Sequence, residues 1–227
     1  MARGTRRHQR WRRRGSGRRK VSFRLARLGR VALLTGDDAR ATELHERARR
    51  LAAEQSHRPA EQFAATGLAL GARRRGDLDT AEARLQPWLE WYRRLGVASG
   101  EALILAQLGY VAEQRGDAEL AEKLHREGLA AARATGDPRA LALGVEGLAG
   151  ARAVAGHMDH AASLGTAAAV RESVHAPLPG SERADVDRVT ARVRDELGED
   201  AFAAAFDRGR GLTANHQIHL LDGPGEG

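Results

Sequence analysis

The sequence predicts an all-α fold: a right-handed superhelical solenoid of four helix hairpins, closed by two further helices at its C-terminal end. Ala, Leu, Arg and Glu dominate the 227 residues, and these residue types are strong helix formers. Only six prolines occur, so few positions in the chain oppose a helix. A 40-residue period runs through most of the chain, and a period in this range is typical of stacked supersecondary units.

The period is clearest at short turns between paired helices. Four dipeptides stand 40 residues apart: Gly36-Asp37, Gly76-Asp77, Gly116-Asp117 and Gly156-His157. Two further columns keep the same spacing: Leu28, Leu68, Leu108 and Leu148, and Ala41, Ala81, Ala121 and Ala161. We expect each glycine to end a first helix in the left-handed conformation, which costs glycine no Cβ clash. Each Asp should then cap the second helix by accepting backbone N–H bonds.

The first element, residues 1–20, is an Arg-rich tail that we expect to be disordered. It carries ten Arg or Lys and no acid, whereas the remaining residues hold 27 Arg or Lys and 30 Asp or Glu. The basic isoelectric point therefore belongs to the tail. Two interpretations stay open: non-specific, salt-dependent binding of nucleic acid through phosphates, or a leader without a selected role.

The second element, residues 21–175, should hold the four hairpins. In the third copy, Leu105, Leu108 and Val111 fall on one face of a first helix at helical spacing. Its second helix should bury Leu120, Ala121, Leu124, Leu129 and Ala132. Gly109 and Ala121 stand where the two helices should cross, because small residues let helix axes approach.

An aromatic stripe marks the second copy. Trp88, Trp91, Tyr92 and Leu95 follow helical spacing, which favours a core face over a ligand site. Pro87 stands inside the same helix. Because an interior proline removes one backbone hydrogen bond and clashes with the preceding turn, we expect a kink there.

Residues 176–210 should form a two-helix cap, and residues 211–227 a second disordered tail. We expect helices near 181–196 and 199–208, the first starting at Ser181. Phe202 and Phe206, four residues apart, should dock the last helix on the array. A terminal unit of a solenoid needs a polar outer face, and the charged stretch 181–198 supplies one.

The order Leu-Gly/Ala, Gly-Asp and then Ala resembles the tetratricopeptide repeat (TPR). The 40-residue period is similar to that of the C-terminal arms of actinobacterial LuxR-type and related ATP-binding transcriptional regulators. The segment "HAPLPGSERADVDRVTARVRDELGEDAFAAAFDRGRGL" (175–212) resembles the segment that closes those arms. The resemblance implies a non-catalytic scaffold that binds a protein or peptide. No GKS/T phosphate loop or helix-turn-helix pattern accompanies the repeats, so we expect the arm alone, as a free-standing protein or a fragment.

The resemblance further implies that the first helix of each pair lines a partner-binding groove. The positions that this places in the groove are Phe23, Arg30, Phe63, Arg73, Arg74, Leu103, Tyr110, Glu113 and Gln114. Arg73 and Arg74 could hold a carboxylate or an acidic peptide, because guanidinium groups bind carboxylates in a planar fork. A solvated helix end is an equally good interpretation of the same pair.

Other classes of function find little support in the sequence. Cysteine is absent, which excludes disulfides and thiolate sites and fits a reducing cytoplasm. No HExxH, GxSxG or Gly-rich phosphate motif is present, so we expect no enzyme, metal or cofactor. His45 and His125 share one repeat column and should be partly buried packing residues. No apolar run is long enough to span a membrane.

Overall fold

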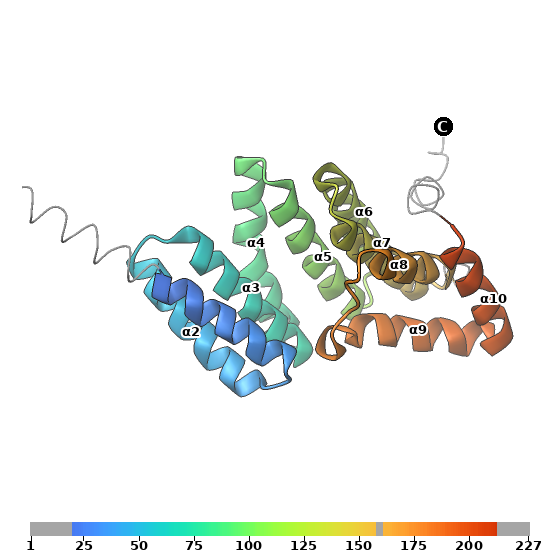
Figure 1. The fold of residues 1–227 in the computed structure, drawn as a ribbon, viewed down its shortest axis with the longest axis horizontal. Coiled ribbons are helices and arrows are strands. Elements are labelled where there is room, and N and C mark those ends of the chain that lie inside the picture. Colours follow the sequence, from blue (N-terminus) through green and yellow to red (C-terminus); the bar gives the residue numbers. More distant parts are fainter. Residues whose placement is uncertain (1–19, 158–160, 213–227) are drawn as a thin grey trace, which may run out of the picture. The chain divides into compact units, whose positions relative to one another are not determined.

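The computed structural model describes residues 20–157 and 161–212, and in these ranges the chain is helical without a strand (Figure 1). Consecutive helices pack on one another as in a helical repeat. The chain divides into two compact units, Met1–Leu85 and Gln86–Gly227. The boundary lies inside α4 (Leu78–Leu95), between Leu85 and Gln86, and Pro87 is the second residue of the second unit. The helix assignment continues through Pro87, and the expected kink stays a prediction.

The first unit contains a first helix over residues 20–34, then α2 (Asp38–Glu54), α3 (Arg58–Arg74) and the start of α4. Helices α2 and α3 pack side by side. Alanines fill the tightest part of the core: Ala26, Ala48 and Ala64 are fully buried and lie in one cluster. Small side chains bring the helix axes close together, so this core needs few aromatic residues.

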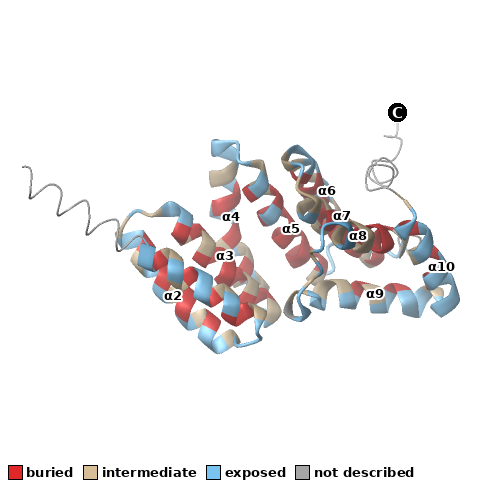
Figure 2. Ribbon diagram, in the orientation of Figure 1, coloured by how far each residue is buried: buried red, intermediate tan, exposed pale blue. Residues whose placement is uncertain are grey.

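The second unit holds the end of α4 and six further helices. These are α5 (Ala98–Gln114), α6 (Ala118–Thr135), α7 (Pro138–Val154), α8 (Ala161–Ser173), α9 (Ala184–Leu197) and α10 (Glu199–Arg210). A 3-10 turn at Gly180–Glu182 precedes α9. Helix α7 packs on α5, α6, α8 and α9, and its buried residues make it the central helix of the unit (Figure 2).

The turns between paired helices have the conformation that the repeat predicts. Gly36, Gly76, Gly116 and Gly156 all have φ between +78° and +84°. The next residue donates its N–H to a carbonyl five positions back, as His157 does to Arg152 at 2.9 Å. The carboxylates of Asp37, Asp77 and Asp117 each accept an N–H from the residue three positions on. The first three turns therefore each end one helix and cap the next, and the fourth, at Gly156, ends its helix in the same conformation.

The aromatic stripe of α4 packs within the second unit. Trp88 is buried and meets Trp91 edge-on, with ring centroids 5.6 Å apart. Tyr92 lies against the start of α5, where a Cβ at Gly100 would come within 2.1 Å of the tyrosine ring. Gly100 thus admits the aromatic ring. Leu95, the last residue of the stripe, is instead 55% exposed.

The C-terminal helices differ from the predicted cap. Helix α9 begins at Ala184 rather than at Ser181, because the 3-10 turn occupies the preceding residues. Helix α10 packs against α8, as a cap on the last hairpin would. Helix α9 packs on α7, α8 and α10, and its Arg188 reaches Glu113 of α5, so it also covers a face of the hairpins. Leu120 was expected in the core but is 38% exposed on α6, where the first turn of the helix faces solvent.

None of the described helices combines the length and the apolar character that a membrane crossing requires. The two predicted tails lie outside the described residues, apart from Lys20, which already belongs to the first helix, and residues 211–212.

Candidate functional site

Two of the predicted groove residues meet in the first unit. The rings of Phe23, on the first helix, and Phe63, on α3, lie 5.8 Å apart between centroids. The guanidinium of Arg27 lies over the Phe23 ring at 5.8 Å, a cation–π arrangement. Both phenylalanines are only half-buried, so part of each ring faces solvent.

The predicted arginine pair has structural partners. Arg74 Nη1 donates to the carbonyl of Leu33 at 3.0 Å and lies 3.8 Å from Asp38 Oδ1. Arg74 therefore donates a hydrogen bond to a backbone carbonyl in the last turn of the first helix. Arg73 is buried. The two guanidinium groups therefore do not form the exposed pair that the sequence predicted for holding a partner's carboxylate. Arg30, another predicted groove residue, is half-buried next to His45.

In the second unit, the predicted groove residues Tyr110 and Glu113 are buried, with 2% and 5% of their surface exposed. The Tyr110 ring packs edge-on against His125 at a centroid distance of 5.0 Å. Gln114 is half-buried. The expectation that Tyr110 and Glu113 face an open groove is wrong, because neighbouring helices cover them.

Helix α9 supplies the partner of Glu113. Arg188 Nη2 donates to Glu113 Oε1, and Arg188 Nη1 donates to Asp185 Oδ1 at 3.0 Å. Burial tends to lower the pKa of Arg188, but the carboxylates of Glu113 and Asp185 outweigh burial and raise it. Arg188 therefore stays charged and joins α9 to α5.

A second buried pair lies on α7 and α8. Arg171 holds Glu146 through two parallel hydrogen bonds of 2.6 and 2.7 Å, the geometry in which guanidinium and carboxylate interact most strongly. Burial raises the pKa of Glu146, Arg171 opposes this, and the nearby Asp185 adds to it. We call Glu113, Glu146, Arg171, Asp185 and Arg188 the charge cluster.

Gly150 makes room for this arrangement. A Cβ at Gly150 would stand 2.3 Å from Glu113 Oε2 and 3.1 Å from Val189 Cγ2 of α9. At the same repeat position, the three preceding first helices carry Arg30, Leu70 and Tyr110. A side chain of that size on α7 would push α9 away.

The sequence interpretation missed Glu146, Gly150, Arg171 and Arg188. The change to glycine in the column of Arg30, Leu70 and Tyr110 was the one pattern that could have revealed a close helix contact. The pairing of Glu113 with Arg188 spans 75 residues, and no periodicity in the chain encodes it.

One repeat position of the first helices is apolar throughout yet incompletely buried. It holds Phe23, Phe63, Leu103 and Leu143. Leu103 is 40% exposed, and the other three are half-buried. We call these residues the apolar column. Incompletely buried aromatic and aliphatic side chains supply the contact area on which protein interfaces depend.

Two histidines occupy matching places in the two units. His45 fits between Gly29 and Gly67, where an added Cβ would come within 2.8 and 2.3 Å of the ring. His125 fits in the same way between Gly109 and Gly147, with distances of 2.5 and 2.1 Å. Both imidazoles are fully buried, more so than the sequence predicted. Burial, together with the positive charge of Arg30, lowers the pKa of His45 from 6.5 to about 4.

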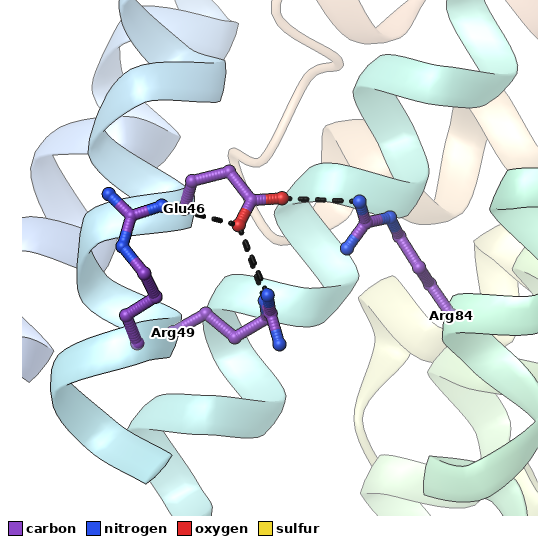
Figure 3. Close-up of polar contacts among 4 residues, drawn as sticks. Glu46, Arg49 and Arg84 are labelled. Atoms are coloured by element: carbon purple, nitrogen blue, oxygen red, sulfur yellow. Dashed lines mark hydrogen bonds and ion pairs between the residues drawn. The ribbon is translucent and has the colours of Figure 1, made fainter. Parts of the chain in front are cut away.

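A more exposed group of charges lies on α2 and α4. Glu46 accepts hydrogen bonds from Arg84 at 3.1 Å and from Arg49 at 3.3 Å, and Arg50 approaches at 3.9 Å (Figure 3). The Glu46 side chain is 25% exposed, so water screens these pairs. We call this group the Glu46 cluster.

Residues 20–157 and 161–212 contain no group of three or more His, Asp or Glu side chains placed to hold a metal ion. In comparisons with known proteins, no family model matches the chain. No curated protein matches it either. The resemblance to tetratricopeptide arms therefore rests on the repeat residues and the closing segment alone.

Proposed function

We propose that this chain is a non-catalytic helical-repeat scaffold that binds a protein or peptide. In this proposal its helix pairs are TPR-like and form a right-handed superhelix. By its resemblance to actinobacterial regulators, it would act in the cytoplasm as the sensor or partner-docking arm of a transcriptional regulator.

The observation that carries the proposal is the apolar column. A repeat protein that needed this position only for its core would bury it, as it buries Leu68, Leu108 and Leu148, three members of another column whose terminal member Leu28 is 54% exposed. Instead Leu103 keeps 40% of its surface exposed, and Phe23 and Phe63 form a partly exposed aromatic pair. Aromatic residues are enriched at protein interfaces, where they carry much of the binding energy.

The charge cluster fits a scaffold better than an active site. Glu113 and Glu146 each face an arginine, and the pairs join four helices. A general base needs a carboxylate that can reach a substrate proton. Here the carboxylates instead neutralise guanidinium groups, a use that fixes the docking of helices.

The test is partner capture by two purified single variants of the chain, Phe63→Asp and Leu103→Asp. A charge in the apolar column should abolish capture of a partner from extracts of the source cells, quantified by mass spectrometry. Leu120→Asp is the matched control, because Leu120 is equally exposed at 38% but lies on the second helix of its pair. Equal capture by all three variants would contradict the proposal, provided that their circular dichroism matches that of the parent chain.

A second candidate function follows from the charge of residues 1–20. Ten basic residues without an acid would bind the phosphates of a nucleic acid with strong salt dependence and little sequence preference. A chain that starts at residue 21 should then lose retardation of duplex DNA at low salt. If the full chain gives no retardation at about 50 mM salt, this candidate fails.

A further inference from the structure

One side of the first helix exposes large apolar side chains between basic ones. Val21, Leu28 and Val31 are 43%, 54% and 55% exposed. Their spacing of seven and three residues places them on one side of the helix. Arg24 and Arg27 are exposed on the same side, at helical spacing from the apolar three. We call these five residues the first-helix face.

The apolar positions of this face are covered in a repeat that follows another helix pair. Leu28 and Val31 correspond, 120 residues later, to Leu148 and Ala151 on α7, which are 1% and 0% exposed. Both lie in buried clusters with side chains of α6, the second helix of the preceding pair. The first helix therefore leaves exposed the surface through which α7 packs on α6.

Arg27 occupies a position that elsewhere admits a histidine of the preceding pair. Its counterparts are Gly67 and Gly147, and a Cβ added there would meet the rings of His45 and His125 at 2.3 and 2.1 Å. The two histidines belong to α2 and α6, each the second helix of the pair before the glycine. A helix that docked on the first-helix face in the same way would place its residue at the histidine position opposite Arg27.

The charge of the first helix favours a carboxylate at that position. This helix carries Lys20, Arg24, Arg27 and Arg30 and no acid. Two copies of the chain that met through their first helices would oppose like charges, which weakens association. Guanidinium groups instead form strong, often paired hydrogen bonds with carboxylates. An acidic helix therefore complements this face better than a second copy does.

A polar cap on the array does not account for the whole face. The terminal unit of a solenoid needs a polar outer surface, and the two arginines supply it. Three large apolar side chains do not fit that role. At the other end of the chain, α10 covers α8, the second helix of the last pair, and Thr166 Oγ1 donates to the carbonyl of Gly209 at 2.7 Å. The first helix has no such covering helix among the described residues.

We infer that the first-helix face is a docking site for an acidic amphipathic helix of a partner protein. The partner helix packs as the second helix of a preceding pair would, with apolar side chains on Leu28 and Val31 and carboxylates beside Arg24 and Arg27. This is the helix-in-groove mode of recognition, read through side chains three or four residues apart. The inference goes beyond the proposed function, because the face shares no residue with the apolar column.

A charge swap between chain and peptide tests the position opposite Arg27. The probe is a fluorescent synthetic peptide with the sequence of residues 117–136, which span α6 and its caps, carrying H125E. The full chain should bind it saturably in fluorescence anisotropy, and Arg27→Glu should weaken binding at least about tenfold. A peptide carrying H125K should show the opposite preference between the two chains.

The matched control for the charge swap is Arg47→Glu. It makes the same reversal at an exposed position on α2 and should leave the affinity for the H125E peptide unchanged. This control separates docking on the first-helix face from the general attraction between a basic chain and an acidic peptide.

The apolar part of the face is tested with Val31→Asp. The variant should also weaken binding of the H125E peptide at least about tenfold, because a carboxylate replaces an apolar contact and repels the peptide. Leu95→Asp is its control, since Leu95 is 55% exposed, as Val31 is, but lies at the end of α4. If Arg27→Glu loses its helical circular dichroism, this second pair of variants decides.

Several results would overturn the inference. One is the absence of saturable binding of the H125E peptide, and another is equal affinity of the folded parent and Arg27→Glu chains for it. A dimer of the parent chain that Val31→Asp dissociates in sedimentation would assign the face to a second copy. Binding to phosphatidylglycerol vesicles that Val31→Asp abolishes, without peptide binding, would assign it to a lipid surface. Phe63 and Leu103 lie outside the face, so the capture test of the proposed function can fail or succeed independently.

Discussion

The two compact units share one packing device and differ in how their charged side chains are covered. In each unit, a histidine from the second helix of a pair fits between two glycines. His45 with Gly29 and Gly67 stands 80 residues before His125 with Gly109 and Gly147. The device therefore occurs once in each unit, at positions two repeats apart.

The charged clusters show the difference. In the first unit, Glu46 has a 25% exposed side chain and faces three arginines. In the second, Glu146 is 5% exposed and holds a two-bond pair with Arg171. Surface ion pairs contribute little to stability because water and salt screen them. Loss of one partner of a buried pair leaves an uncompensated charge in the interior. Burial therefore decides the energetic weight of these clusters, and the number of pairs does not.

The largest expected effect comes from breaking the buried pair. Arg171→Met should lower the free energy of unfolding of the second unit by about 3–5 kcal/mol, because the Glu146 carboxylate stays buried without its partner. Denaturant titration followed by the fluorescence of Trp88 and Trp91, which belong to this unit, measures the change. The matched control is Arg210→Met, which removes an exposed two-bond pair with Glu172 and should change the midpoint little. Equal losses in both variants would show that burial does not separate the two kinds of pair.

The next effect is acid destabilisation through His45. Above pH 6.5 the imidazole is neutral in both the folded and the unfolded chain. As the pH falls from 6.5 to about 4, the unfolded chain takes up a proton that the folded chain does not. The free energy of unfolding should therefore fall across this window, by about 3 kcal/mol in total from this one group.

His45→Gln should remove this part of the pH dependence, since glutamine does not titrate. The measurement is the free energy of unfolding at half-unit steps from pH 7.5 to 4. All other groups are common to the two chains, so the difference between the curves isolates residue 45. Parallel curves for the variant and the parent would contradict the assignment of the acid-sensitive step to His45.

A smaller effect should test the shared packing device. Gly67→Ala and Gly147→Ala each place a methyl group against an imidazole, in the first and second unit respectively, and each should cost about 1–3 kcal/mol of stability. Gly180→Ala serves as the control, because a Cβ there meets no atom within 4 Å. Thermal unfolding monitored by circular dichroism reports all three. If one unit accepts the alanine without loss, its histidine is not held as the structure describes.

The smallest effect should come from the Glu46 cluster. Glu46→Gln keeps the size and one hydrogen-bond acceptor of the side chain and should reduce the free energy of unfolding by less than about 1 kcal/mol. Raising the salt concentration should shrink the difference further, because exposed charges are screened. A loss as large as that of Arg171→Met would remove the contrast between the two clusters.

Local features of the fold could be predicted from the sequence because their causes are local. Gly36, Gly76 and Gly116 end helices since only glycine enters the left-handed region without strain. The following aspartates cap the next helix through hydrogen bonds three residues away. The all-helical class and most helix boundaries follow from such signals combined with the 40-residue period.

The candidate site was much harder to predict. The resemblance to tetratricopeptide proteins placed Tyr110 and Glu113 in a groove, because it compares each helix only with its repeat position. It carried no information about α9, which lies outside the repeat and returns to cover that face. The ion pair of Glu113 with Arg188 depends on where the closing segment docks, and no local pattern encodes that.

The sequence by itself thus determined a chain of capped, paired helices with small residues at their crossings. Only the tertiary structure decided which charged side chains became buried and paired, and which apolar ones stayed partly exposed. The physical reason is the range of the interactions. Capping, glycine conformation and helical spacing act within a few residues, whereas desolvation and charge pairing depend on every helix that comes to lie nearby.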